Sequence, residues 1–132
     1  MKYLLDTHTW IWWHMQPGRL PEQVRQLIAT PENYDELLVS AISAWEFAKL
    51  VEKGRLGISC ETLCWLHEAI KMPKFRMVPL TLEVASCSTQ LPAPFHSDPA
   101  DQIIVATARL EQATLLTADE RILAYPYCDT LW

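Results

Sequence analysis

Basic side chains are scarce in this sequence of 132 residues, and long apolar runs are absent. It has 11 lysines and arginines against 16 aspartates and glutamates, a net charge of −5. Proteins that bind nucleic acid through a basic surface carry the opposite balance. No apolar stretch approaches the roughly 20 residues that span a bilayer, and the first residues lack the apolar region and cleavage site of a signal peptide. We therefore expect a cytoplasmic protein that does not associate with membranes.

Cysteine pairs with the spacing of a metal or redox motif are also absent. No two of the four cysteines form a CxxC pair, so free thiols of a cytosolic protein are the favoured interpretation. The chain shows no internal repeat, low-complexity tract or linker. Its length fits one domain, spanning 1–132, with a hydrophobic core.

Short apolar segments alternate with helical patterns along the chain. Strands are predicted at 2–6, 36–40, 75–80, 113–117 and 128–132, and helices at 7–15, 21–30, 43–54, 59–72, 81–91 and from Asp98 onward. The predicted strands are short and apolar, as in a buried parallel sheet. Strands that alternate with helices predict an α/β fold in which helices cover both faces of such a sheet.

The segment HSDPADQIIVATA (96–108) opens with the pattern of a helix start. Asp98 is a preferred N-cap residue, Pro99 fits the first helical position, and Asp101 falls at the third. The helix dipole favours both acids there. Taken alone, the segment predicts a helix N-terminus and no chemistry.

Other acids follow the ends of the predicted strands. Asp6 ends the first strand, Asp119 lies just beyond the fourth, and Glu46 lies in the first turns of the helix after the second. Ligands of open α/β sheets bind beyond the carboxyl ends of the strands. If the first and fourth strands are neighbours, these acids share one rim of the sheet with Asp98 and Asp101.

Each of these acids also has a purely structural interpretation. Asp6 is compatible with a turn after a strand, and Asp119 with the cap of a short helix. Glu46 is compatible with an ion pair to Lys49 one turn away, although it lies on an otherwise apolar stripe.

Gathered on one rim, several carboxylates would repel each other unless a cation intervened. Oxygen ligands without histidine or cysteine suit Mg²⁺ or Mn²⁺. Such ions support the hydrolysis of phosphodiesters. The arrangement of the acids therefore favours a metal-dependent hydrolase over a set of unrelated helix caps.

Five segments occur in the order typical of a known family: LLDTHTWIWW, VSAISAWEFAKLVEKGRL, VPLT, HSDPADQIIVATA and LLTADERI. Over essentially its whole length the chain resembles the PIN-domain ribonucleases, in particular the VapC-like toxins of toxin–antitoxin pairs. The resemblance implies a three-layer α/β sandwich with a short parallel sheet ordered 3-2-1-4-5. It also implies a metal-dependent endoribonuclease that cleaves RNA to a 5′-phosphate and a 3′-hydroxyl. A small antitoxin partner and a homodimer are implied as well.

The resemblance further implies that Mg²⁺ or Mn²⁺ is bound by four acids, which also carry the catalysis. These are Asp6, Glu46, Asp101 and Asp119. Thr7 and Thr117 match hydroxyl positions that hold a carboxylate or a water in place. Asp98 matches the accompanying acid of the Asp-Pro-x-Asp stretch, as a cap or an outer contact.

The sequence gives less specific predictions for the histidines and for the basic residues that contact RNA. His96 is expected in a loop near the site and not as a ligand, whereas the other three, His8, His14 and His67, are expected to be structural. Contact with an RNA backbone needs positive charge. Two groups of basic residues are candidates for it: Lys49, Lys53 and Arg55, and Lys71, Lys74 and Arg76.

Two other functions fit parts of the pattern. A haloacid-dehalogenase-like, Mg²⁺-dependent phosphatase also begins with a strand that ends in aspartate. Its chemistry needs a second aspartate two residues later, where this chain has His8. A non-catalytic interaction module with the same fold is the other alternative. Loss of one of the four acids would favour the module, and all four are present.

Overall fold

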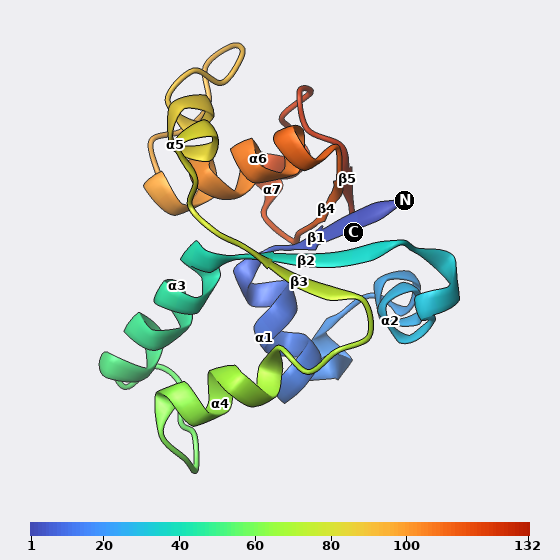
Figure 1. The fold of residues 1–132 in the computed structure, drawn as a ribbon, viewed down its shortest axis with the longest axis vertical. Coiled ribbons are helices and arrows are strands. Elements are labelled where there is room, and N and C mark those ends of the chain that lie inside the picture. The colour runs from blue at the N-terminus through green and yellow to red at the C-terminus, as the bar shows by residue number, and fades with distance from the viewer.

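Five strands form one sheet at the centre of the molecule (Figure 1). The computed structural model describes all residues, 1–132. The strands are β1 (Lys2–Leu5), β2 (Glu36–Ser40), β3 (Phe75–Val78), β4 (Thr114–Leu116) and β5 (Thr130–Leu131). All neighbouring strands are parallel, and their order is β3-β2-β1-β4-β5. The expected strand order is confirmed.

Helices cover both faces of this sheet. The helices are α1 (Thr7–Met15), α2 (Glu22–Ala29), α3 (Ala41–Glu52), α4 (Thr62–Ala69), α5 (Leu82–Ser88), α6 (Pro99–Glu111) and α7 (Glu120–Leu123). In Figure 1, α1, α2 and α4 lie on one side of the sheet and α5, α6 and α7 on the other. The three-layer α/β sandwich is therefore confirmed. None of these helices has the length and apolar character needed to cross a bilayer.

The buried positions of β1, β2 and β4 are mostly apolar on both faces, because successive side chains point to opposite faces and both faces are covered. Leu4 belongs to one core cluster with Ile104 of α6, while its neighbour Leu5 belongs to the other with Trp10 of α1. All four of these side chains are fully buried. The same alternation separates the side chains of β2 and β4.

Most helix boundaries lie within a few residues of the prediction, and two differences have a clear cause. α3 begins at Ala41, before the predicted start, because Ser40 caps it by accepting a hydrogen bond from the Ile42 N–H at 3.2 Å. α4 is shorter than its apolar pattern, and Leu63 is 62% exposed. The packed face of α4 instead carries Trp65, whose ring stacks on Phe47 with the centroids 3.9 Å apart.

Candidate active site

A cavity of about 410 Å³ lies at the carboxyl edge of the sheet. Five carboxylates line it: Asp6, Glu46, Asp98, Asp101 and Asp119. Asp6 follows β1, Glu46 lies in α3, Asp98 and Asp101 begin α6, and Asp119 caps α7. The structure thus brings together the four acids expected from the sequence, with Asp98 beside them.

Asp6 is the most buried of these acids, with 9% of its surface exposed. Its Oδ1 accepts the Thr7 backbone N–H at 2.8 Å and caps α1, and its Oδ2 accepts the Thr117 hydroxyl at 2.6 Å. Burial raises the pKa of Asp6 although these hydrogen bonds oppose the shift. The Thr117 Oγ1 also accepts the backbone N–H of Asp119 at 3.0 Å. One hydroxyl therefore ties together the acids that follow β1 and β4.

Glu46 is held in place from α1. Its Oε1 accepts the Thr7 hydroxyl at 2.5 Å, and the Thr7 Oγ1 lies 2.8 Å from the Ser43 Oγ. Burial raises the pKa of Glu46, and the negative charges of Asp6 and Asp98 raise it further. The side chain is therefore directed into the cavity and not to the solvated face of α3.

The alternative interpretation of Glu46 as a surface ion-pair partner is wrong. Lys49 pairs with Glu52 instead, at 3.0 Å between Nζ and Oε1. The two other structural interpretations hold in part, because Asp6 and Asp119 both cap helices while they line the cavity.

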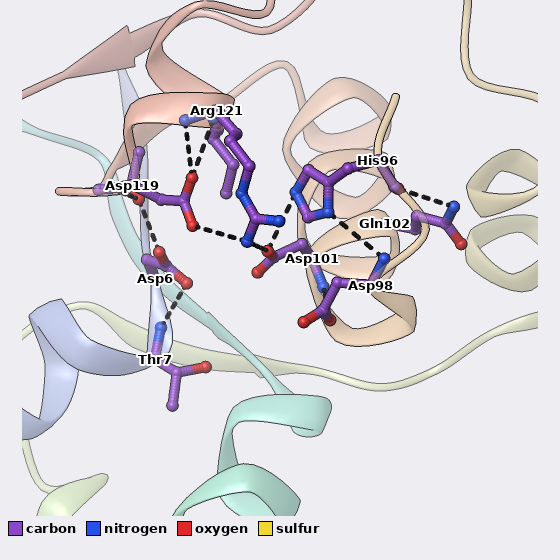
Figure 2. Close-up of polar contacts among 10 residues, drawn as sticks. Asp6, Thr7, His96, Asp98, Asp101, Gln102, Asp119 and Arg121 are labelled. Carbon is purple, nitrogen blue, oxygen red and sulfur yellow. Dashed lines mark hydrogen bonds and ion pairs between the residues drawn. The ribbon is translucent and has the colours of Figure 1, made fainter. Parts of the chain in front are cut away.

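Asp101 lies between two side chains that the sequence did not assign to it (Figure 2). The His96 Nε2 is 3.2 Å from Asp101 Oδ2. The Arg121 Nη2 lies 3.7 Å from the same oxygen and 3.6 Å from the Asp119 Oδ2. Arg121 therefore bridges the acid at the start of α6 and the acid at the start of α7.

The ring of His96 is oriented by its other nitrogen. The His96 Nδ1 accepts the backbone N–H of Asp98 at 3.3 Å, so the proton of a neutral ring resides on Nε2, which faces Asp101. This approach has the distance but not the angle of a hydrogen bond, and Nε2 has no other partner. His96 lies in the loop before α6, as expected, but its ring contacts a site acid.

The pKa of Asp101 is strongly raised by its surroundings. Its side chain is 14% exposed. Burial raises the pKa of Asp101 to about 7, and the charges of the other four acids contribute in the same direction. Clustered carboxylates that disfavour each other's ionised form are stabilised by a nearby cation.

The donor set fits a hard divalent cation, because every acid offers carboxylate oxygens. As the side chains are placed, no three histidine, cysteine, aspartate or glutamate side chains are grouped closely enough to hold an ion. Asp119 Oδ1 accepts two backbone N–H groups of α7, and Asp101 faces His96 and Arg121. Metal binding therefore requires side-chain rotations that release Arg121 and bring the carboxylates together.

Sequence reasoning missed three contributors to the site. Arg121 follows the cap residue Asp119 by two positions, and its side chain points back toward Asp119 and Asp101. Ser43 contacts Thr7 from one turn before Glu46. His8, which was expected to be structural, is exposed and lines the cavity. Only the Arg121 spacing was a signal available in the sequence.

The comparisons with known proteins agree with this architecture. The PIN domain family matches residues 3–126. The chain belongs to the PIN domain family. This PIN domain is also 38% identical to Ribonuclease VapC22 of Mycobacterium tuberculosis (strain ATCC 25618 / H37Rv), over 98% of the chain and 97% of that protein. The family expected from the five sequence segments is confirmed.

Solved structures share the fold at lower identity. VapBC2 from Rickettsia felis, bound to a DNA fragment from its promoter, has a chain with a TM-score of 0.74 and 17% identity, with 99% of this chain and 98% of that chain covered. A toxin–antitoxin complex from Klebsiella pneumoniae has a chain with a TM-score of 0.64 and 16% identity, with 98% and 96% covered. At these identities the likeness shows the PIN fold alone.

Proposed function

We propose that this PIN domain is a metal-dependent endoribonuclease and acts as the toxin of a toxin–antitoxin pair. The observation that carries the proposal is the convergence of Asp6, Glu46, Asp101 and Asp119 on one cavity. It is supported by the 38% identity to a protein named a ribonuclease. No observation favours the phosphatase alternative, and the complete set of four acids disfavours a non-catalytic module.

The four acids are the proposed ligands of Mg²⁺ or Mn²⁺ and the proposed catalytic residues. Thr117 and Thr7 position two of them, since their hydroxyls donate to Asp6 and Glu46. Asp98 is exposed and caps α6 by accepting the Asp101 N–H at 3.2 Å. Its geometry supports a positioning role at the margin of the site.

The proposed reaction is hydrolysis of a phosphodiester. The oxygen of a water bonds to phosphorus, the bond from phosphorus to the 3′ oxygen breaks, and that oxygen takes a proton. The products are a 5′-phosphate and a 3′-hydroxyl. A bound Mg²⁺ or Mn²⁺ supplies neutralisation of phosphate charge and a more acidic water. Arg121 lines the same cavity and offers a guanidinium to a phosphate oxygen.

The proposal includes partners. Because the structural relatives include a toxin–antitoxin complex, we propose that a cognate antitoxin protein covers the site of this chain. We also propose that the chain forms a homodimer and acts on RNA in the cytoplasm.

Cleavage of total RNA by the purified chain tests the function. We expect cleavage with Mg²⁺ or Mn²⁺, none with EDTA, and a loss of about a hundredfold or more in Asp101→Asn. Asp129→Asn is the matched control, since Asp129 is exposed and lies outside the cavity. If Asp101→Asn and wild type cleave equally, the nuclease does not reside in this site.

A further inference from the structure

The proposed function needs a surface that holds RNA on a protein of net charge −5. Building on that function, we infer that single-stranded RNA lies in a groove between α1 and α3 that leads out of the acidic cavity. We call it the α1–α3 groove. Its basic side chains are Lys49, Lys53 and Arg55, the first of the two groups that the sequence left as candidates.

Neighbouring hollows connect this groove to the acids through shared lining residues. The acidic cavity shares Thr7, His8 and Glu46 with a hollow of about 180 Å³ beside α3. That hollow shares His8, Leu50 and Arg55 with another of about 340 Å³ between α1 and α3. Since each hollow shares side chains with the next, the three hollows are neighbours, and we place the strand that leaves the acids along them.

The charge of the lining changes sign along that path. Beyond the acids, the two hollows contain Lys49, Lys53, Arg55 and Arg19, and Glu46 is the one acid that lines them. Lys49 lies on α3, about 4.5 Å of helical rise beyond Glu46. Lys53, the C-cap residue of α3, lies about 10.5 Å of helical rise beyond Glu46. Lys53 and Arg55 are exposed and take part in no ion pair. Their charge is free to bind phosphates.

The second candidate group of bases is already engaged elsewhere. Arg76 contacts Glu36 and Glu111, each at 2.6 Å. Lys74 donates to two backbone carbonyls at 2.8 Å, and none of the group lines the acidic cavity. Binding RNA there would break contacts within the protein, so the observations favour the α1–α3 groove.

An exposed tryptophan identifies the strand as unpaired. Trp45 is 55% exposed, lines the groove beside Glu46, and has the Lys49 Nζ 5.7 Å from its ring centroid. Unpaired bases stack on such rings, whereas the bases of a duplex already stack on each other. We therefore place one base next to the cleaved phosphate on Trp45, with the backbone running toward Lys53 and Arg55.

Two double variants test the groove. Lys53→Gln with Arg55→Gln removes two charges from it, and Arg25→Gln with Lys71→Gln removes two charges that make only local surface pairs. Both are made in the Asp101→Asn background with Mg²⁺, and binding of a fluorescent single-stranded RNA of mixed sequence is followed by anisotropy at several salt concentrations. Gels verify that the RNA stays intact.

We expect the groove variant to bind RNA about tenfold more weakly or worse, and the control to stay within about twofold of the background. The slope of log K against log salt should become shallower by about 1.4, because two phosphate contacts are lost. Trp45→Ala should weaken binding about fivefold or more, and Trp45→Phe should restore most of it.

Equal RNA binding by the two double variants would overturn the groove while wild-type RNA cleavage still supported the nuclease. If the groove variant lost affinity only for a protein partner, the groove would be a protein interface and the inference would be wrong. Absence of both RNA binding in the background and cleavage in wild type would overturn the groove and the proposed function together.

Discussion

The two edges of the sheet hold similar charged side chains in opposite electrostatic states. At the amino edge, Arg76 contacts Glu36 and Glu111 at 2.6 Å, and the Lys2 Nζ lies 3.6 and 3.4 Å from the same two carboxylates. Hydrogen bonds from Arg76 hold the pKa of both glutamates below the ordinary value. Two acids and two bases therefore form a balanced network.

At the carboxyl edge the acids outnumber the bases. Five carboxylates line one cavity, and Arg121 is the one lysine or arginine among its lining residues. Burial and mutual repulsion raise the pKa of Glu46 and Asp101 there. The number of charged groups therefore does not mark the site. The site is marked by acids that the fold gathers and leaves without matching cations.

The largest expected difference between the edges concerns metal affinity. Asp6→Asn keeps the helix cap and removes one proposed ligand, so we expect Mn²⁺ to bind about a hundredfold more weakly, measured by calorimetry. Glu36→Gln removes the same charge at the amino edge and should leave the affinity within about twofold. Equal losses in the two variants would show that overall charge, and not the acid cluster, attracts the ion.

Removing Arg76 from the ion-pair network at the amino edge should lower stability and leave RNA cleavage unchanged. Arg76→Met leaves Glu36 and Glu111 with Lys2 as their one cation. Because the network is partly exposed, we expect a loss of about 2 kcal/mol in the free energy of unfolding, measured in urea. RNA cleavage under folding conditions should match wild type, and a parallel loss of cleavage would contradict the separation of the two edges.

Stability of the metal-free protein should fall as pH rises. The pKa of Asp101 is raised from 3.8 to about 7 by folding. The stability linked to its protonated form is fully present below pH 3.8 and is lost as pH rises through about 7. Asp101→Asn should therefore raise the free energy of unfolding by about 1–2 kcal/mol at pH 8, a Tm increase of several degrees. At pH 5 the increase should be smaller.

Mn²⁺ provides the control for this pH dependence. Added at pH 8, Mn²⁺ should raise the Tm of wild type, because the bound cation offsets the charge of the ionised Asp101 as its proton does at lower pH. It should not raise the Tm of Asp101→Asn, which lacks that carboxylate. The same change in Tm between pH 5 and 8 in wild type and in Asp101→Asn would contradict the raised pKa of Asp101.

Loss of the contact between His96 and Asp101 should lower the metal affinity less than loss of a proposed ligand. In His96→Asn the amide oxygen can replace Nδ1 as the acceptor for the Asp98 N–H, but the side chain is too short to reach Asp101. We expect Mn²⁺ affinity to fall about tenfold. His96→Gln places its amide near the position of Nε2 and should retain affinity. Equal affinities with equal Tm values in the two variants would show that the ring only fills space.

Local features of the chain made most of the fold predictable. The apolar segments and helix patterns placed the five strands and α1 to α6, because side-chain periodicity and caps act over a few residues. The short helix α7 entered only as a helix that Asp119 could cap. Asp98 caps α6 through the Asp101 N–H as its sequence context indicated. The strand order and the choice of four of the acids as metal ligands, in contrast, came from the resemblance to a family. Leu63 of α4 is exposed, and its apolar character alone does not show which face of the helix is buried.

The strands, most helices, the caps and the presence of the acids could therefore be read from the chain, since they depend on neighbours along it. Three features appear only in the folded molecule: Asp6, Glu46 and Asp101 share one cavity, Arg121 bridges two of the acids, and Arg76 is engaged in ion pairs. They escape a reading of the chain because electrostatic interactions act through space. Whether a charge is paired or free depends on which distant segments the sheet brings within a few ångströms of it.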